Sequence, residues 1–275
     1  MTSTLRIAAS AFFVSLSCFS AFGQPAPASP SAQGFHSQVR LLSGGRQGEN
    51  WLSGVQITLD EGFKTYWRNP GESGLPPSFD WSASENVESV EVQWPAPKRH
   101  EDAAGVAYVY SHEVVLPVVV KPKAADKPVK LALVVDYGVC KDICIPAHAD
   151  LSMGLTEAGP QRAAIETFMA KVPRRQAVGA QGELTVLSVQ PRNGAKPELS
   201  VSVLAPSGEK PALFAEAPDN WYVSSSTADA DNRFTVTVEE KPKDASGPVP
   251  LTLTLVAGDK AIETQVSLDA GNSPR

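Results

Sequence analysis

Two cysteines, Cys140 and Cys144, are the residues of this sequence best suited to chemistry, because only three residues separate them and no other cysteine follows residue 23. Thiol–disulfide exchange needs an attacking thiolate, an accessible sulfur and a partner dithiol or disulfide. A disulfide between them closes a loop of five residues, which the chain-entropy model credits with only about 2 kcal/mol of stabilisation. The spacing therefore favours a redox-active pair over a structural disulfide.

Two predicted strands position this pair. Apolar residues alternate with polar ones on both sides of it, at Val129, Leu131, Leu133 and Val135 and again at Ala149, Leu151, Met153 and Leu155. This period of two is typical of half-buried strands. Four extended residues span roughly 13 Å, whereas a disulfide needs Cα atoms about 4.4 to 6.8 Å apart. We therefore expect the cysteines in a sharply turned connection between two strands, with Pro146 fixing its exit.

Neighbouring residues leave more than one chemistry open. Lys141 favours a thiolate and Asp142 opposes it, so the direction of the thiol pKa shift stays undetermined. His148 could exchange protons near neutral pH or could be a solvated loop residue. Alternatively, Cys140, Cys144 and His148 offer soft ligands suited to Cu(I). A third possibility is a structural module that binds a partner and has an inert disulfide.

The first 23 residues predict export. Arg6 precedes an uncharged apolar run that ends in Ala21-Phe22-Gly23, which is typical of a secretory signal peptide with a cleavage site between small residues. Cys18 lies inside this segment, but Ser15 stands where a lipoprotein signal has an aliphatic residue, so lipid anchoring is not favoured. An exported protein occupies a compartment in which disulfides persist.

Composition excludes several classes of function. The formal net charge is −6, without long runs of either sign, so no basic stripe is present to meet the phosphates of a nucleic acid. No segment after the signal peptide approaches 18 consecutive apolar residues, which predicts a soluble mature chain without a transmembrane segment. No cofactor is expected.

The remaining pattern predicts an all-β protein. Residues 24–34 are rich in Pro, Ala and Ser and are expected to form a disordered leader. Short alternating strands over residues 35–155 predict an antiparallel sandwich, with a long loop at residues 68–80 where Pro and Gly accumulate. Residues 156–182 predict one short helix and a linker. Alternation over residues 183–270 predicts a second sandwich, without cysteine or histidine, for packing or docking.

Three segments carry a family resemblance: YGVCKDICIP at residues 137–146, GFKTYW at residues 62–67, and residues 94–117. Together they resemble the amino-terminal periplasmic domain of DsbD-type thiol:disulfide interchange proteins, closest to the branch with the suppressor-of-copper-sensitivity membrane reductases. The resemblance covers roughly residues 34–155 and implies an immunoglobulin-like fold there, a periplasmic location and a link to copper tolerance. It also implies a protein-disulfide reductase that takes electrons from a thioredoxin-like module and passes them to periplasmic clients.

The resemblance also assigns site residues. Cys140 and Cys144 match the redox pair, with Cys144 as the site of the mixed disulfide. The start of the loop that shields the cysteines is matched by His100, Glu101 and Asp102, and an aromatic lining the site by Tyr66.

The sequence departs from the family pattern in three respects. Only three residues separate the cysteines, and the aromatic after the acidic pair is missing, so we expect Tyr108 or Tyr110 to replace it. The membrane and thioredoxin domains do not follow, so a separate membrane thiol reductase is expected.

Overall fold

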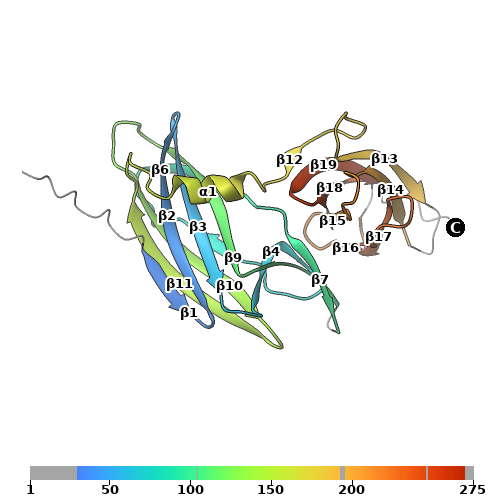
Figure 1. Cartoon of the computed structure of the whole chain (residues 1–275), viewed down its shortest axis with the longest axis horizontal. Coiled ribbons are helices and arrows are strands. Elements are labelled where there is room, and N and C mark those ends of the chain that lie inside the picture. The colour runs from blue at the N-terminus through green and yellow to red at the C-terminus, as the bar shows by residue number, and fades with distance from the viewer. Residues whose placement is uncertain (1–29, 104, 193–195, 246, 270–275) are drawn as a thin grey trace, which may run out of the picture.

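The computed structural model describes residues 30–103, 105–192, 196–245 and 247–269, and strands dominate this part of the chain. The predicted signal peptide, with Cys18, lies outside the described residues. One helix is found among them, α1 (Arg162–Met169), and no described helix has the length and apolar character needed to cross a membrane. The prediction of a mostly β protein with antiparallel sheets is confirmed (Figure 1).

Residues 31–154 form two sheets. The first has the order β1 (Ser31–Gly34), β2 (Ser37–Gln47), β3 (Asn50–Leu59), β9 (Glu113–Pro122) and β6 (Val87–Val92). The second has the order β11 (Cys144–Gly154), β10 (Lys130–Cys140), β4 (Lys64–Gly71), β8 (Gly105–Ser111) and β7 (Lys98–Asp102), with β5 (Ser78–Asp80) also paired to β10. All these pairings are antiparallel.

Apolar side chains from both sheets meet in one core. Alternate residues of β10, Leu131, Leu133 and Val135, are fully buried and pack in the same cluster as Val55 and Leu116 of the first sheet. Burial of every second residue is the physical result of the period of two in the sequence. On the outer face of the first sheet, α1 packs Ile165 into a smaller cluster.

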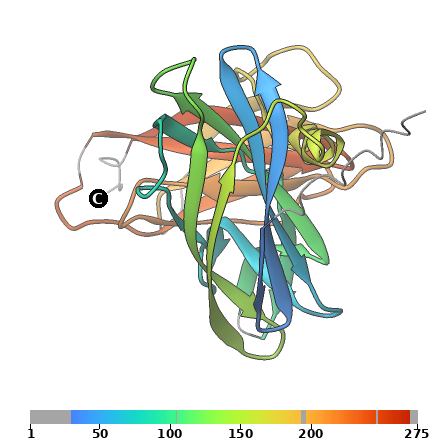
Figure 2. The ribbon, with the colours of Figure 1, turned by 90° about the vertical axis from the view of Figure 1, so that its left-hand side faces the viewer.

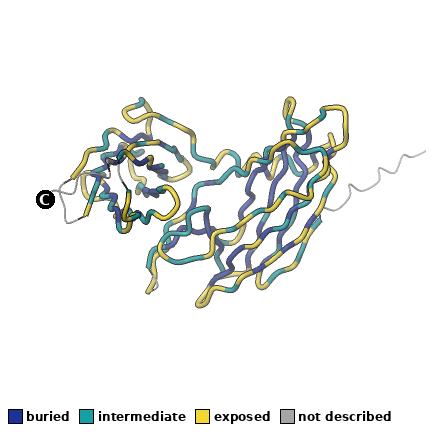
Figure 3. Tube along the Cα trace, turned by 180° about the vertical axis from the view of Figure 1, so that it is seen from behind, coloured by how far each residue is buried: buried dark blue, intermediate teal, exposed yellow. Residues whose placement is uncertain are grey.

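The chain after α1 forms two further sheets. One has the order β12 (Arg174–Arg175), β19 (Lys260–Asp269), β18 (Pro248–Ala257) and β15 (Ala212–Glu216); the other has β13 (Thr185–Arg192), β14 (Glu198–Leu204), β17 (Arg233–Glu240) and β16 (Tyr222–Ser225). Their apolar residues form a separate core. Figure 3 shows buried segments inside each of the two pairs of sheets.

The two pairs of sheets are in contact. Phe214 on β15 is fully buried, yet it belongs to the core of the first pair, where its ring lies 4.8 Å from that of Tyr108 and 5.9 Å from that of Trp67. In Figure 2 the strands of the second pair run across those of the first. An aromatic side chain of the second pair is therefore part of the core of the first pair.

Local predictions need three corrections. Residues 31–34, assigned to the disordered leader, form β1 because they pair with residues 37–40 of β2. The predicted loop at residues 68–80 shrinks to residues 72–77, since β4 continues to Gly71 and β5 begins at Ser78. The predicted linker contains the two-residue strand β12, which pairs in parallel with β19.

Candidate functional site

Cys140 and Cys144 form a disulfide at the end of the β10–β11 hairpin. Cys140 is the last residue of β10, Cys144 is the first of β11, and the two are directly opposite in the register, with a Cα–Cα distance of 4.2 Å. Residues 141–143 make the turn that the spacing required. The strands reach the cysteines themselves, which alternation did not predict, because residues 137–140 are buried on both faces of the sheet.

The two sulfurs lie in different environments. Cys140 is only 1% exposed, whereas Cys144 is an exposed residue on β11, an edge strand of its sheet. Cys140 belongs to a small apolar cluster with Tyr66, Ala107 and Val109, separate from the main core. A partner protein can therefore approach Cys144 directly, while Cys140 lies behind it.

The hydroxyl of Tyr66 contacts both sulfurs. It donates a hydrogen bond to Sγ of Cys140 at 2.9 Å and lies 2.9 Å from Sγ of Cys144. Burial, with a smaller contribution from the carboxylate of Asp102, raises the pKa of Tyr66 above 10.0. The phenol therefore keeps its proton at neutral pH and is available as a donor to a thiolate. The assignment of Tyr66 to the lining of the site agrees with this geometry.

Residues 72–77, here called the covering loop, lie over this tyrosine. A Cβ added to Gly74 would overlap the ring of Tyr66, and one added to Gly138 would lie 2.8 Å from Cβ of Leu75. Gly138 is two residues before Cys140, so both face the same side of β10. The loop thus packs against the tyrosine and the strand that hold the disulfide.

A charged cluster lies next to β4. Lys64 is the register partner of Cys140, and its Nζ lies 2.8 Å from Nε2 of His100 and 3.5 Å from Oδ2 of Asp102. His100 Nε2 is also 3.1 Å from that carboxylate. Glu101 instead pairs with Arg99 at 2.7 Å. Of the three predicted residues on β7, the structure therefore groups His100 and Asp102 with Lys64 and separates Glu101 from them.

Tyr108 does not lie at the disulfide, which corrects the expectation that it replaces the missing aromatic. On β8, Ala107 and Val109 share the cluster of Cys140, while Tyr108 and Tyr110 belong to the main core. Successive side chains on a strand point to opposite faces, so neither tyrosine can cover the sulfurs. Tyr108 packs on Phe214 instead.

The alternative copper site is also corrected. His148 is on β11, four residues beyond Cys144, which corresponds to roughly 13 Å along an extended strand. Its Nδ1 lies 2.7 Å from Oδ1 of its register partner Asp136. Metal–ligand bonds are about 2 Å long, so Cys140, Cys144 and His148 cannot share an ion in this arrangement. The described residues contain no group of three or more His, Cys, Asp or Glu side chains placed to hold a metal.

Sequence reasoning missed Lys64, Gly74 and Gly138. Lys64 is significant only because the register places it opposite Cys140, and no local pattern reports that pairing. The sequence did point to the two glycines, since Gly74 lies in the predicted loop at residues 68–80 and Gly138 in the YGVCKDICIP segment. The side chain that packs on each glycine could not be predicted, because it depends on how the loop folds.

An exposed cysteine bonded to a buried one, on an antiparallel β scaffold, is an arrangement suited to thiol–disulfide exchange. Residues 35–155 match the family model for the N-terminal domain of the thiol:disulfide interchange protein DsbD. Over those residues the chain is therefore similar to this family, as the resemblance predicted.

One solved structure extends the likeness in fold. The N-terminal periplasmic domain of ScsB from Proteus mirabilis is 22% identical, with a TM-score of 0.62, over 86% of this chain and 94% of that chain. Since the match covers 86% of this chain, it continues past residue 155. Domains 5–6 of the S-layer protein SbsC are 14% identical, over 89% of this chain and 100% of that chain, with a TM-score of 0.22. No curated protein matches the sequence.

Proposed function

We propose that this protein is a periplasmic thiol:disulfide interchange protein. Its Cys140–Cys144 pair passes electrons between a donor, which is a membrane thiol reductase or a thioredoxin-like protein, and periplasmic client proteins. In this proposal the two pairs of sheets are two immunoglobulin-like sandwiches joined by α1 and the segment after it. The family match over residues 35–155 supports this function, as does the presence of the cysteines as a disulfide.

The unequal burial of the two cysteines carries the proposal. An inert disulfide can be buried on both sides, whereas exchange requires one sulfur that a partner thiolate can reach. Cys144 is exposed and Cys140 is 1% exposed. Cys144 is therefore the sulfur that is attacked, and Cys140 is the leaving group.

The exchange proceeds in two balanced steps. A thiolate of the reduced donor attacks Sγ of Cys144, a new S–S bond forms, and the Cys140–Cys144 bond breaks with its electron pair going to Cys140. The donor's second thiol, as its thiolate, then attacks the donor sulfur of the mixed disulfide and releases Cys144. The donor leaves as a disulfide and the pair is reduced by two electrons. Reduction of a client disulfide follows the same steps in reverse.

Tyr66 assists the first step. As the Cys140–Cys144 bond breaks, negative charge develops on Sγ of Cys140, to which the phenol already donates a hydrogen bond. Hydrogen bonds to a charged acceptor are stronger than those between neutral groups. The tyrosine therefore lowers the pKa of the leaving thiol, and a leaving thiol of lower pKa departs faster.

The surface around Cys144 suits a protein partner. Ile143, at the tip of the hairpin, is 71% exposed, and Leu75 of the covering loop is 39% exposed. Exposed apolar side chains beside a reactive group can be buried by a partner protein when it binds. A thioredoxin-like partner would cover them when its cysteine reaches Cys144.

Trapping of mixed disulfides tests the proposal. In Cys140→Ala the exposed Cys144 has no resolving thiol, so we expect it to accumulate mixed disulfides with periplasmic proteins, visible on non-reducing gels. The matched control is Cys144→Ala, which keeps only the buried thiol and should trap little. If Cys140→Ala traps no more than this control, the exchange function is wrong.

A further inference from the structure

The second pair of sheets holds the chain segment that leads into the covering loop. Arg68, two residues after Tyr66 on β4, donates hydrogen bonds to Glu216 Oε1 at 2.8 Å and Oε2 at 2.7 Å, and to Glu263 Oε2 at 2.6 Å. Glu216 is on β15 and Glu263 on β19. The guanidinium also stacks on the ring of Trp67, 4.6 Å from its centroid. One side chain of the redox domain is thus bound by two carboxylates of the other pair of sheets.

These three charges are well shielded from water. The side chains of Arg68, Glu216 and Glu263 are 29%, 18% and 14% exposed. A bidentate arginine–carboxylate pair fixes orientation as well as distance. Removal of Arg68 would leave Glu216 without its bound cation and Glu263 with only the more distant Arg175, at 3.9 Å. Because both carboxylates are shielded from water, this loss would weaken the contact of β15 and β19 with β4.

Between Arg68 and the covering loop, the chain makes further contacts with β15 and β8. Asn69 donates a hydrogen bond to the carbonyl of Ala215 at 3.2 Å. Gly71, with a φ of +83°, packs so closely on β8 that an added Cβ would lie 2.5 Å from the carbonyl oxygen of Val106. The N–H of Glu72 donates to that carbonyl at 2.8 Å, and the carboxylate of Glu72 accepts the N–H of Val106 at 3.1 Å.

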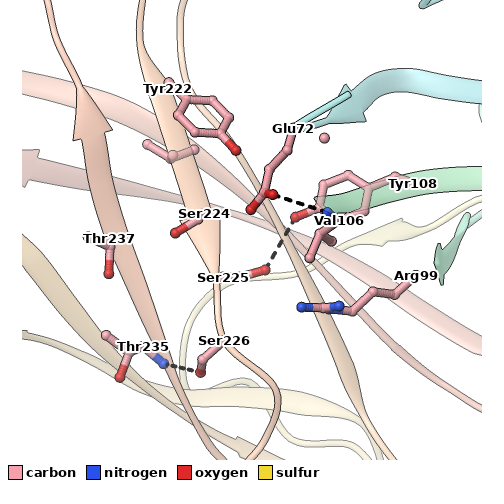
Figure 4. A pocket seen from close by; sticks show the side chains of 12 residues that line it. Glu72, Arg99, Val106, Tyr108, Tyr222, Ser224, Ser225, Ser226, Thr235 and Thr237 are labelled. Atoms are coloured by element: carbon pink, nitrogen blue, oxygen red, sulfur yellow. Dashed lines mark hydrogen bonds between the residues drawn. The ribbon is translucent and has the colours of Figure 1, made fainter. Parts of the chain in front are cut away.

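Glu72 lies where the two pairs of sheets meet. Figure 4 shows its carboxylate beside Val106, with Tyr222 and Ser225 of β16 on the other side. These residues line a cavity of about 320 Å³ between the pairs of sheets. The first residue of the covering loop is therefore placed by contacts at this boundary, and the next residues pass over Tyr66.

We propose that the second pair of sheets positions Tyr66 on the disulfide, with Arg68 as the positioning residue that transmits this effect through the covering loop. The contacts form a continuous series from Glu216 and Glu263 to Arg68, from the loop to the ring of Tyr66, and from its hydroxyl to both sulfurs. This inference rests on the proposed exchange function, since it assigns the second pair of sheets a role in that chemistry.

A double-mutant cycle between Arg68 and Tyr66 tests this inference. The first measurement is the pKa of the Cys140 thiol, followed by thiolate absorbance in a Cys144→Ala background. Tyr66→Phe and Arg68→Met should each raise this pKa by about one unit, which is a tenfold loss of thiolate stabilisation. With Tyr66→Phe already present, Arg68→Met should have no further effect, because Arg68 acts only through the hydroxyl.

The second measurement is the rate at which dithiothreitol reduces the Cys140–Cys144 disulfide in the otherwise unaltered chain. Arg68→Met should slow the reduction severalfold, since a leaving thiol of higher pKa departs more slowly. The double variant Glu216→Gln with Glu263→Gln should act in the same direction, and it provides the test if Arg68→Met does not fold. Arg233→Met is the matched control, because it breaks an exposed ion pair with Asp231 within the second pair of sheets.

Three results would overturn the inference. The first is an unchanged pKa of Cys140 in Arg68→Met, and the second is a pKa change caused by Arg68→Met that is equally large in the presence of Tyr66→Phe. The third is faster reduction of Arg68→Met by dithiothreitol. Faster reduction would show that the loop acts only as a cover. Dithiothreitol needs no protein partner, so these measurements stay valid if the trapping experiment fails. Failure of the exchange function and failure of this inference are therefore distinguishable.

Discussion

The two pairs of sheets have similar interiors but different outer faces. Each buries one main apolar core. In the first pair, besides the cluster under α1, the sheet that contains β4, β8 and β10 buries an apolar cluster on its outer face, where Cys140 and Tyr66 lie. Among the described residues no corresponding outer cluster is found in the second pair. Both cysteines of the site and all four histidines belong to the first pair.

This difference shows what makes a β scaffold reactive. A sheet covered on one face exposes its other face to water, where a sulfur would be equally open to every thiol. A loop packed on the outer face gives one sulfur a shielded position with a hydrogen-bond donor and leaves its neighbour accessible. Among its described residues the second pair has no loop packed in this way. It supplies the two carboxylates that bind Arg68, just before the covering loop begins.

The largest expected effect concerns the aromatic contact between the pairs. Phe214→Ala should lower the free energy of unfolding by about 3–5 kcal/mol and separate the thermal unfolding of the two pairs into two calorimetric transitions. Phe234, equally buried but within the second core, provides the control: Phe234→Ala should destabilise the second pair to a similar extent. A single unchanged transition in Phe214→Ala would contradict the proposed coupling of the cores.

A smaller effect is expected from the disulfide. Its loop is short, so reduction should lower the stability of the first pair by only about 2 kcal/mol and leave the second pair unchanged. Urea unfolding of the oxidised and reduced protein measures this difference. A loss of stability well above that value would indicate that the disulfide is structural and would argue against a redox-active pair.

The smallest effect is alkaline destabilisation. Burial raises the pKa of all five tyrosines, to about 12 for Tyr222. Between the unfolded pKa near 10 and the higher folded value, only the folded state keeps the proton, so stability falls as pH rises. The buried Tyr110 contributes one proton, or about 1.4 kcal/mol per pH unit. Tyr110→Phe should flatten the curve of melting temperature against pH above pH 10, and an unaltered slope would exclude this contribution.

Part of the site could be predicted from local sequence. The spacing of Cys140 and Cys144 required a sharp turn, and the turn is present at residues 141–143. The family resemblance singled out Tyr66, whose hydroxyl lies 2.9 Å from each sulfur. Tyr108, expected to replace the missing aromatic, faces the opposite side of its strand. Alternation shows that neighbours on a strand point in opposite directions, and it does not show which direction leads to the disulfide.

The sequence by itself determined the β character of the chain, the position of α1 and the pairing of the only two cysteines beyond residue 23, because each depends on residues close together in the chain. Tertiary structure alone decided which cysteine is exposed, which face of β8 lies at the disulfide and what holds the covering loop. Arg68 and Glu216 are separated by 148 positions, and such contacts arise from strand register and from the packing of whole sheets, which no local period encodes.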